Sequence, residues 1–229
     1  TYRGQPFAIE EHLVRLERSA QALQLAIGQT RAQWSSLIRE GLRLSQFPEA
    51  KIYLQITRGQ APRDHPFPVS SAPTTVLTFR ELRPLDVSVR HAGVQAMLFE
   101  DIRWGRCDIK SVNLLANVLA RQRAKEAGVF EAILVREGTV TEGSVSNVMV
   151  VRNGAVQTAP EGRRILSGVT RAIVLDLARK EGIPVAESFV TREELLAASE
   201  VFLTGTTVEV LPVVRVDGHA IGGGSPGPV

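Results

Sequence analysis

The second half of the chain is dominated by short apolar segments, which turn signals and a few amphipathic helices separate. The pairs Asn153-Gly154 and Asp217-Gly218 are typical of tight hairpin turns. Many short strands with interspersed helices favour a mixed α/β fold, built on a mixed sheet or an irregular barrel. The predicted strands are Gly93–Phe99, Glu131–Arg136, Ser146–Arg152, Val201–Thr204 and Val208–Val216, and the predicted helices are Ser111–Ala127, Val169–Glu181 and a short one that begins at a capping box of Thr191 and Glu194.

The first half follows a different pattern. Between Ala8 and Ile27 the apolar side chains recur at steps of four and three, which predicts an amphipathic helix. A second helix is expected around Trp34–Leu42. Alternation of apolar and polar residues then predicts a strand at Ala50–Thr57, with another at Thr74–Phe79. The segment Arg58–Ser71 contains three prolines and is expected to be an irregular loop.

The segment Leu82-Arg83-Pro84-Leu85 is the expected connection between two domains, because proline favours an extended chain there. We expect an N-terminal α/β domain in residues 1–81, a linker in residues 82–86 and a C-terminal domain in residues 87–229. A chain of 229 residues that is 44% hydrophobic can form one large or two modest cores.

Composition argues against several classes of protein. The net charge is only +3 and the basic residues are scattered, so nucleic acid is not an expected partner. The single cysteine, Cys107, is expected to be buried and fits a reducing cytoplasm. No apolar run reaches the roughly 18–20 residues of a membrane span, and neither a signal peptide nor a metal-ligand pattern is visible. The chain begins at Thr1 and ends in a glycine- and proline-rich tail, so an excerpt or a truncated chain is expected.

A lysine at a predicted strand-to-helix junction and an acid on a separate strand are the first candidates for chemistry. Lys110 lies in Asp108-Ile109-Lys110-Ser111, and Glu142 lies in Thr141-Glu142-Gly143-Ser144. With phosphate-binding segments nearby, this combination suits pyridoxal phosphate. The lysine would form a Schiff base with the aldehyde, and the acid would keep the pyridine nitrogen protonated. Taken alone, a lysine beside acids is more often a solvated surface charge.

Three further features could bind a phosphate. Ser167-Gly168-Val169-Thr170-Arg171 opens a predicted helix, whose free amides can bind an anion. Thr204-Gly205-Thr206-Thr207 follows an apolar strand and offers hydroxyls and a glycine amide. Arg15 lies on the first helix. Each has an ordinary explanation: a helix cap, a turn and an arginine that extends along the surface, respectively.

Arg63 and His65 form a possible carboxylate clamp within the proline-rich loop. Two side chains that are two residues apart on an extended segment can point to the same side, and arginine can pair with a carboxylate through two hydrogen bonds. The ordinary alternative is a mobile surface loop.

Together these residues resemble the class IV pyridoxal-phosphate aminotransferases. Within that class, the loop from Thr57 through Arg63-Asp64-His65 is most similar to the D-amino-acid aminotransferases, whose carboxylate trap uses an arginine and a histidine in this arrangement. The resemblance extends from the helix around His12 and Arg15 to Val216. It rests on Asp101-Ile102-Arg103-Trp104, Arg106-Cys107-Asp108-Ile109-Lys110-Ser111, Thr141-Glu142-Gly143-Ser144, Ser146-Asn147 and Gly168-Val169-Thr170-Arg171.

The resemblance implies transamination between D-amino acids such as D-alanine and 2-oxo acids such as 2-oxoglutarate. Lys110 would carry the Schiff base and move the α-proton, and Glu142 would pair with the pyridine nitrogen, which would lower the Glu142 pKa. The implied fold is the two-domain fold type IV, an N-terminal α/β domain and a C-terminal pseudo-barrel domain with the cofactor between them, usually as a homodimer. The residues implied in cofactor binding are Lys110, Glu142, Arg15, Leu166, Gly168, Val169, Thr170, Gly205 and Thr206, and those implied in substrate binding are Arg63 and His65.

The sequence departs from the family in three places. The N-terminal strands, which carry a tyrosine of the carboxylate trap, and the final helix are absent, and Gly205 stands where close relatives have serine. Three alternatives therefore stay open. An aminodeoxychorismate lyase would share Lys110 and Glu142, a branched-chain L-amino-acid aminotransferase would share the whole cofactor site, and a non-catalytic chain would keep only the fold.

Overall fold

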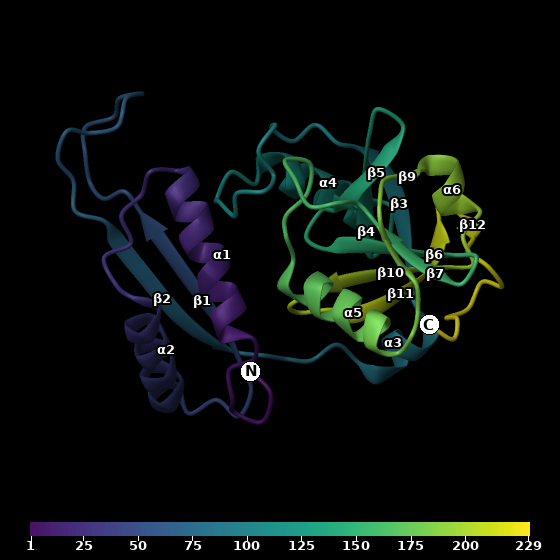
Figure 1. Cartoon of the computed structure of the whole chain (residues 1–229), viewed down its shortest axis with the longest axis horizontal. Coiled ribbons are helices and arrows are strands. Elements are labelled where there is room, and N and C mark those ends of the chain that lie inside the picture. Colours follow the sequence, from purple (N-terminus) through teal and green to yellow (C-terminus); the bar gives the residue numbers. More distant parts are fainter. The chain divides into compact units, whose positions relative to one another are not determined.

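The computed structural model describes residues 1–229. They form two compact units, Thr1–Pro84 and Leu85–Val229. Figure 1 shows the first unit as two helices beside a two-stranded sheet and the second as a larger sheet with helices around it. No helix is both long and apolar enough to cross a membrane.

The first unit is built from two helices and one hairpin. Its small core contains Leu13, Trp34 and Ile38 from the helices, packed against apolar side chains of both strands. The elements are α1 (Ile9–Ala22), α2 (Arg31–Ser45), β1 (Ala50–Thr57) and β2 (Thr74–Glu81), with β1 and β2 antiparallel.

The prediction of the first helix was too long at its C-terminal end. The helix ends at Ala22 because Gln24 adopts a left-handed conformation with a φ of 50°, and Leu25 donates its N–H back to the carbonyl of Ala20. The loop after β1 is irregular, as predicted. At its start, Arg58 donates to the carbonyls of Leu23 and Gln24 and stacks over Phe67.

The second unit contains a ten-stranded mixed sheet with the strand order β8-β7-β6-β10-β11-β3-β4-β5-β9, in which β12 pairs with β11. Parallel pairs (β7 with β8, β3 with β11 and β3 with β4) are combined with antiparallel ones, as the sequence predicted. The strands are β3 (Val94–Glu100), β4 (Glu131–Arg136), β5 (Thr139–Gly143), β6 (Asn147–Arg152), β7 (Ala155–Thr158), β8 (Val185–Glu187), β9 (Val190–Thr191), β10 (Glu200–Gly205), β11 (Glu209–Val216) and β12 (His219–Ala220).

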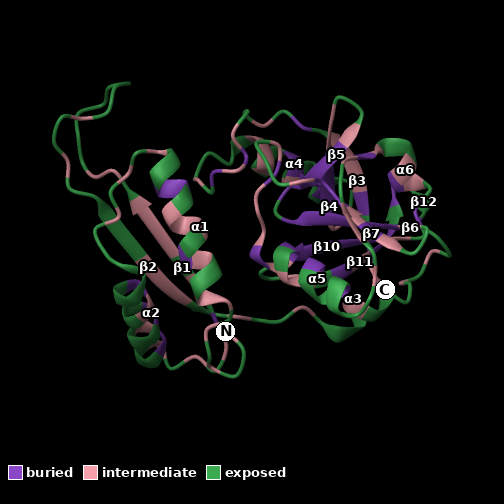
Figure 2. Ribbon diagram, in the orientation of Figure 1, coloured by how far each residue is buried: buried purple, intermediate pink, exposed green.

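The sheet curls, and this brings β5 close to β6. These strands are far apart in the strand order, yet the N–H of Gly143 donates to the carbonyl of Ser146 over 2.7 Å. The main core fills the curled sheet with residues such as Ile133, Leu203 and Leu211, all at or near zero exposure. Figure 2 shows these central strands as the most buried part of the unit.

Four helices accompany the sheet: α3 (Val87–Ala92), α4 (Leu115–Glu126), α5 (Val169–Lys180) and α6 (Arg192–Leu196). α4 packs on β4 through small side chains, Ala120 and Ala124 against Ala132. α5 packs through Leu175 on an apolar cluster that includes Met149 of β6. The predicted start of α4 at Ser111 is wrong, because the helix begins only at Leu115. The predicted turns Asn153-Gly154 and Asp217-Gly218 and the Thr191–Glu194 capping box are confirmed.

Candidate active site

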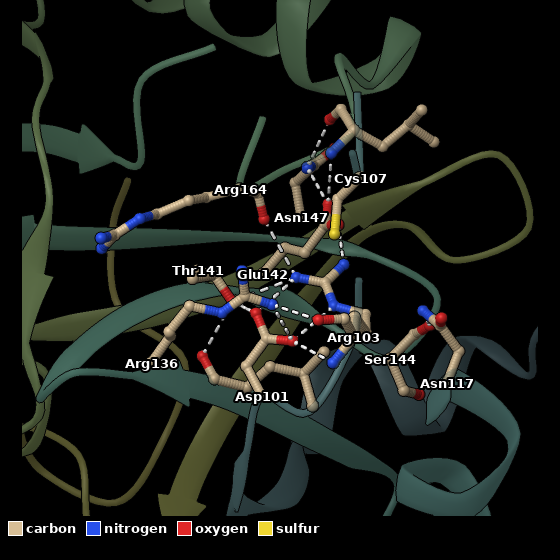
Figure 3. A network of polar contacts seen from close by, with 12 residues as sticks. Asp101, Arg103, Cys107, Asn117, Arg136, Thr141, Glu142, Ser144, Asn147 and Arg164 are labelled. Atoms are coloured by element: carbon tan, nitrogen blue, oxygen red, sulfur yellow. Dashed lines mark hydrogen bonds and ion pairs between the residues drawn. The ribbon is translucent and has the colours of Figure 1, made fainter. Parts of the chain in front are cut away.

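Glu142 lies near the end of β5 and is buried, with 5% of its surface exposed. Its Oε2 accepts hydrogen bonds from Asn147 Nδ2 (2.9 Å) and from the backbone N–H of Leu166 (3.0 Å). Its Oε1 accepts a charged hydrogen bond from Arg103 Nη1. Donors from three separate segments therefore hold the carboxylate in one orientation, as Figure 3 shows.

Arg103 binds two buried carboxylates, those of Glu142 and Asp101. It binds Asp101 through Nε and Nη2, each over 2.8 Å, and Nη2 also donates to the carbonyl of Arg164. Arg136 is a second partner of Asp101, with its Nη2 3.0 Å from Asp101 Oδ1. The result is a largely buried row of alternating charges, Arg136–Asp101–Arg103–Glu142 (Figure 3). The ion pairs of this row hold Arg103 in place beside Glu142. Removing one partner of such a buried ion pair generally lowers the free energy of unfolding by about 3–5 kcal/mol.

Burial and charge act against each other in this row. Burial raises the pKa of Glu142 to about 7, although Arg103 and the Leu166 amide act in the opposite direction. Burial also opposes ionisation of Asp101, but the hydrogen bonds and charge of Arg103 lower the pKa of that carboxyl below its usual value. Burial lowers the Arg103 pKa less than the two carboxylates raise it, so Arg103 stays charged. The expected lowering of the Glu142 pKa is therefore not produced by the chain itself, because desolvation outweighs Arg103.

A second buried acid explains the glycine and serines that follow Glu142. Glu131, at the start of β4, is 1% exposed and accepts hydrogen bonds from the hydroxyls of Ser144 and Ser146. A Cβ at Gly143 would lie 2.2 Å from Ser146 Oγ and 3.1 Å from Glu131 Oε2, so only glycine fits there. Glu131 therefore fixes the segment between β5 and β6 through these two serine hydroxyls.

Asn147, the first residue of β6, joins Glu142 to the segment before α5. Its Nδ2 donates both to Glu142 Oε2 and to the carbonyl of Leu166, over 2.9 and 3.0 Å. Its Oδ1 lies where a side chain of Gly168 would be, 2.0 Å from an ideal Cβ at that position. Gly168 is the N-cap of α5 and has no side chain with which to cap the helix.

Lys110 lies in the connection between β3 and α4, and its side chain is exposed. Cys107, three residues earlier, is buried, as predicted, and its N–H donates to the carbonyl of Arg163 over 2.9 Å. Burial raises the pKa of the Cys107 thiol. Asn117 of α4 donates to the carbonyl of Ser144 over 2.8 Å, so the helix that follows the Lys110 connection contacts the loop after Glu142.

Glycine at position 205 is not required by the fold. Gly205 has a negative φ, and the closest atom to a Cβ there would be Val208 Cγ2 at 3.4 Å, with the Val145 carbonyl at 3.7 Å. Serine therefore fits at this position. Thr206, the next residue, is exposed in the turn before β11.

The remaining predicted residues belong to the first unit. Arg15 is half-buried on α1 and lies 3.2 Å from His12 Nδ1, and burial together with the nearby Arg18 lowers its pKa. Arg63 and His65 are exposed in the loop between β1 and β2.

Glu142 is thus hydrogen-bonded directly to Leu166, and Asn147 brings it next to Gly168. Gly205 lies near the Val145 carbonyl, in the loop after Glu142. No role was predicted for Arg103, Asn147 or Glu131. Arg103 and Asn147 lie in the motifs Asp101-Ile102-Arg103-Trp104 and Ser146-Asn147. For Arg103 the available signal was the charged pair that it forms with Asp101 directly after an apolar strand. Glu131 begins such a strand and carried no signal, because one acid at a strand end is usually exposed.

Comparison with known proteins identifies the family of the chain. Residues 1–216 match the family described as amino-transferase class IV. The chain is 44% identical over 229 residues to a D-alanine aminotransferase of Bacillus licheniformis and covers 80% of that protein.

Two solved structures share the fold. One is the branched-chain amino acid aminotransferase of Escherichia coli, with a TM-score of 0.88 and 28% identity over 97% of this chain and 75% of that one. The other is the branched-chain enzyme of Thermobaculum terrenum in its PLP form, with a TM-score of 0.81 and 28% identity over 97% and 74% of the two chains. The family match spans most of the sequence, and the chain therefore belongs to the class IV aminotransferases.

Proposed function

We propose that this protein is a pyridoxal-phosphate-dependent transaminase that exchanges the amino group between D-amino acids and 2-oxo acids. The observation that carries the proposal is the buried carboxylate of Glu142, which Asn147, Leu166 and Arg103 fix in the second unit, where Lys110 is also exposed. Burial opposes the ionisation of this acid, and acids whose pKa is strongly shifted are concentrated at functional sites. A ligand with a protonated nitrogen would give the charge a use.

The residues present fit pyridoxal phosphate. Glu142 would accept a hydrogen bond from the ring nitrogen, and Lys110 would hold the aldehyde carbon. The start of α5, which has no side-chain cap, offers the amides of Val169 and Thr170 to the phosphate. Gly168, Gly205, Thr206 and Arg15 would complete the phosphate site, and Leu166 would contact the ring. When bound, the cofactor supplies an electron sink for the carbanion that forms when the substrate loses its α-proton.

The chain's own part is to bind, orient and move protons. The Lys110 amine is the proposed base, which would take the α-proton of the substrate and return it to the carbon of the cofactor that was the aldehyde carbon. Arg103 and Asn147 keep the Glu142 carboxylate in place, and the Glu142 pKa of about 7 lets this group hold or share a proton near neutral pH. We propose Arg63 and His65 as the groups that bind the substrate carboxylate.

D-Amino acids are favoured over branched-chain L-amino acids for two reasons. The identity to the D-alanine aminotransferase is 44%, against 28% to the branched-chain enzymes of similar fold. The Arg63–His65 loop also resembles that of the D-specific enzymes. Branched-chain transamination is the second candidate, because two solved structures of similar fold carry that name.

One assay separates the candidates. The purified protein, loaded with pyridoxal phosphate, is given D-alanine and 2-oxoglutarate, and pyruvate is measured. Parallel reactions contain L-valine with 2-oxoglutarate, or aminodeoxychorismate alone. We expect pyruvate from D-alanine and little product from the other two. Turnover of L-valine would favour the branched-chain function, product from aminodeoxychorismate would favour the lyase, and no binding of cofactor would favour a non-catalytic chain.

Replacing Arg63 with alanine should weaken amino-acid binding without affecting the cofactor. A hydrogen bond to a charged group contributes about 1.5–3 kcal/mol, which corresponds to roughly 10- to 150-fold in affinity. The measurement is a pair of titrations of Arg63→Ala, one with D-alanine and one with pyridoxal phosphate.

Arg39 provides the matched control, because it is an exposed arginine on α2 of the same unit. Arg39→Ala should leave both titrations unchanged. Equal losses for substrate and cofactor in Arg63→Ala would show that the loop is not a carboxylate clamp.

We also propose that the protein is a homodimer located in the cytoplasm and that the two compact units are its functional domains. The support for a dimer is an apolar surface on and before α4: Val112, Leu115, Val118 and Leu119 are between 48% and 71% exposed. Leu115, Val118 and Leu119 follow helical spacing, so they lie on one face. An apolar surface of this kind commonly marks a contact between subunits.

A charge on this surface should therefore produce a monomer. We expect Leu115→Asp to halve the mass measured in solution by sedimentation. Leu177 of α5 is also half-exposed, at 52%, and Leu177→Asp serves as the control that should stay dimeric. A wild-type protein that is already monomeric would contradict the dimer.

A further inference from the structure

The side-chain amide nitrogen of Asn147 has both of its hydrogens committed. Both hydrogens of Nδ2 are used, one toward Glu142 Oε2 at 2.9 Å and one toward the carbonyl of Leu166 at 3.0 Å. The reverse orientation of the amide would direct its oxygen at two acceptors, so the contacts define which atom is which. Asn147 is also buried, with 5% of its surface exposed, and cannot exchange these partners for water.

The oxygen of the same amide explains why residue 168 is glycine. Gly168 has a φ of −73° and a ψ of 131°, which any residue can adopt, so its backbone conformation does not require glycine. A Cβ at this position would instead lie 2.0 Å from Asn147 Oδ1. Glycine is therefore required by the contact with Asn147.

The two contacts hold the segment that leads into α5 at both ends. Leu166 is bound through its carbonyl to Asn147 and through its N–H to Glu142, which closes a three-residue set of hydrogen bonds. Gly168 is two residues later and directly precedes Val169, the first residue of the helix. One buried amide thus contacts both the acid and the helix start.

We propose that Asn147 is a positioning residue that couples the two ends of the cofactor site, the ring-nitrogen acid Glu142 and the phosphate-binding start of α5. This inference rests on the proposed function, which assigns those two roles. Its consequence is that a change at either end is transmitted to the other through Asn147. A residue with a merely structural role would lower stability without linking the two ends.

The test introduces a change at the phosphate end and measures the acid end. Gly168→Ala, Asn147→Ala and the double variant are compared with the wild type as full chains. The acid end is followed in the unloaded protein by the ¹³C signal of the Glu142 carboxyl across pH, assigned with Glu142→Gln. The phosphate end is followed by the affinity for inorganic phosphate.

Gly105 provides the control. It has an ordinary φ, and no atom lies within 4 Å of a Cβ built on it, so Gly105→Ala should change neither measurement. In Gly168→Ala we expect weaker phosphate binding together with a shifted Glu142 titration midpoint. In the loaded protein we expect the half-reaction with D-alanine to slow by about tenfold, the factor that the loss of one hydrogen bond produces.

The double variant decides whether Asn147 carries the effect. If it does, Gly168→Ala has little further effect on the Glu142 titration once Asn147 is alanine, because the clash is gone. Additive effects, or a Gly168→Ala protein whose phosphate affinity falls while the Glu142 titration stays unchanged, would overturn the proposal.

Two results keep this test separate from that of the function. Should Gly168→Ala fail to fold, Asn147→Ala alone must change both the titration and the phosphate affinity, and a change in only one overturns the coupling. A wild-type protein that binds phosphate and shows the coupling but transfers no amino group would refute the proposed function and leave the coupling intact.

Discussion

Replacing Lys110 with alanine is expected to abolish covalent attachment of pyridoxal phosphate and transamination. Lys110 is the only lysine among the residues of the proposed site, so it supplies the primary amine for the aldehyde, and it is also the proposed base. The side chain is exposed in the connection between β3 and α4, so its loss should leave the fold unchanged. In the wild type, borohydride reduction followed by peptide mapping should place the cofactor on Lys110.

The matched control is Lys125→Ala. Lys125 is exposed in the last turn of α4, in the same unit, and its removal should leave the attachment unchanged. Cofactor found on Lys51, Lys125 or Lys180 in the wild type would refute the assignment of Lys110. Non-covalent binding should persist in Lys110→Ala, because the proposed phosphate contacts lie elsewhere.

The elements that the sequence predicted best are those with a local cause. Glu131–Arg136 and Ala50–Thr57 were predicted to the residue, since period-two alternation or a continuous apolar run between turn signals defines a strand. α5 was predicted because Gly182 terminates it in a left-handed conformation. The start of α4 was missed, because nothing between Ser111 and Leu114 interrupts the helical pattern. The backbone there forms local turns instead, in which the Asn113 N–H donates to Ser111 Oγ and the Leu114 N–H donates to the Val112 carbonyl.

The short strands β8 and β9 were missed for a related reason. Each has three residues or fewer, and each exists because a longer strand, β7 or β5, lies beside it. A pattern of two or three residues is too short to indicate a strand. Pairing of this kind is decided by the fold and not by local preference.

The candidate site divides in the same way. Lys110 and Glu142 were identified by residue type and motif, whereas the groups that hold Glu142 come from positions 103, 147 and 166 and meet only in the folded chain. The role of Gly168 illustrates the limit. The sequence suggested only an anion site at the helix start that contains Gly168, whereas the structure shows that Asn147 already occupies the space of a side chain there.

Replacing Glu142 with glutamine is expected to leave the cofactor bound and to slow proton abstraction by about 100-fold or more. A neutral amide cannot stabilise a positive charge on the ring nitrogen, so the electron sink for the substrate carbanion is weakened. The proposed phosphate site does not include this residue. The measurement is the single-turnover rate with D-alanine, together with the affinity for pyridoxal phosphate.

Stability gives a second, independent measurement on the same variant without cofactor. Burial raises the Glu142 pKa from 4.5 to about 7, so the folded protein keeps a proton that the unfolded chain releases between these pH values. The contribution of Glu142 to the free energy of unfolding therefore falls as the pH rises from 4.5 to 7. Glutamine does not titrate, so the stability of the wild type relative to Glu142→Gln should decrease across this window.

Glu137→Gln makes the same chemical change on an exposed acid in the turn between β4 and β5, and should alter neither the turnover rate nor this pH dependence. The two measurements on Glu142→Gln report on different properties. An unchanged single-turnover rate would mean that Glu142 has only a structural role, because its contacts with Arg103, Asn147 and Leu166 would then be its whole function. A reduced rate with a flat stability difference would instead mean that Arg103 keeps the carboxylate ionised throughout, so that the acid meets the ring nitrogen already charged.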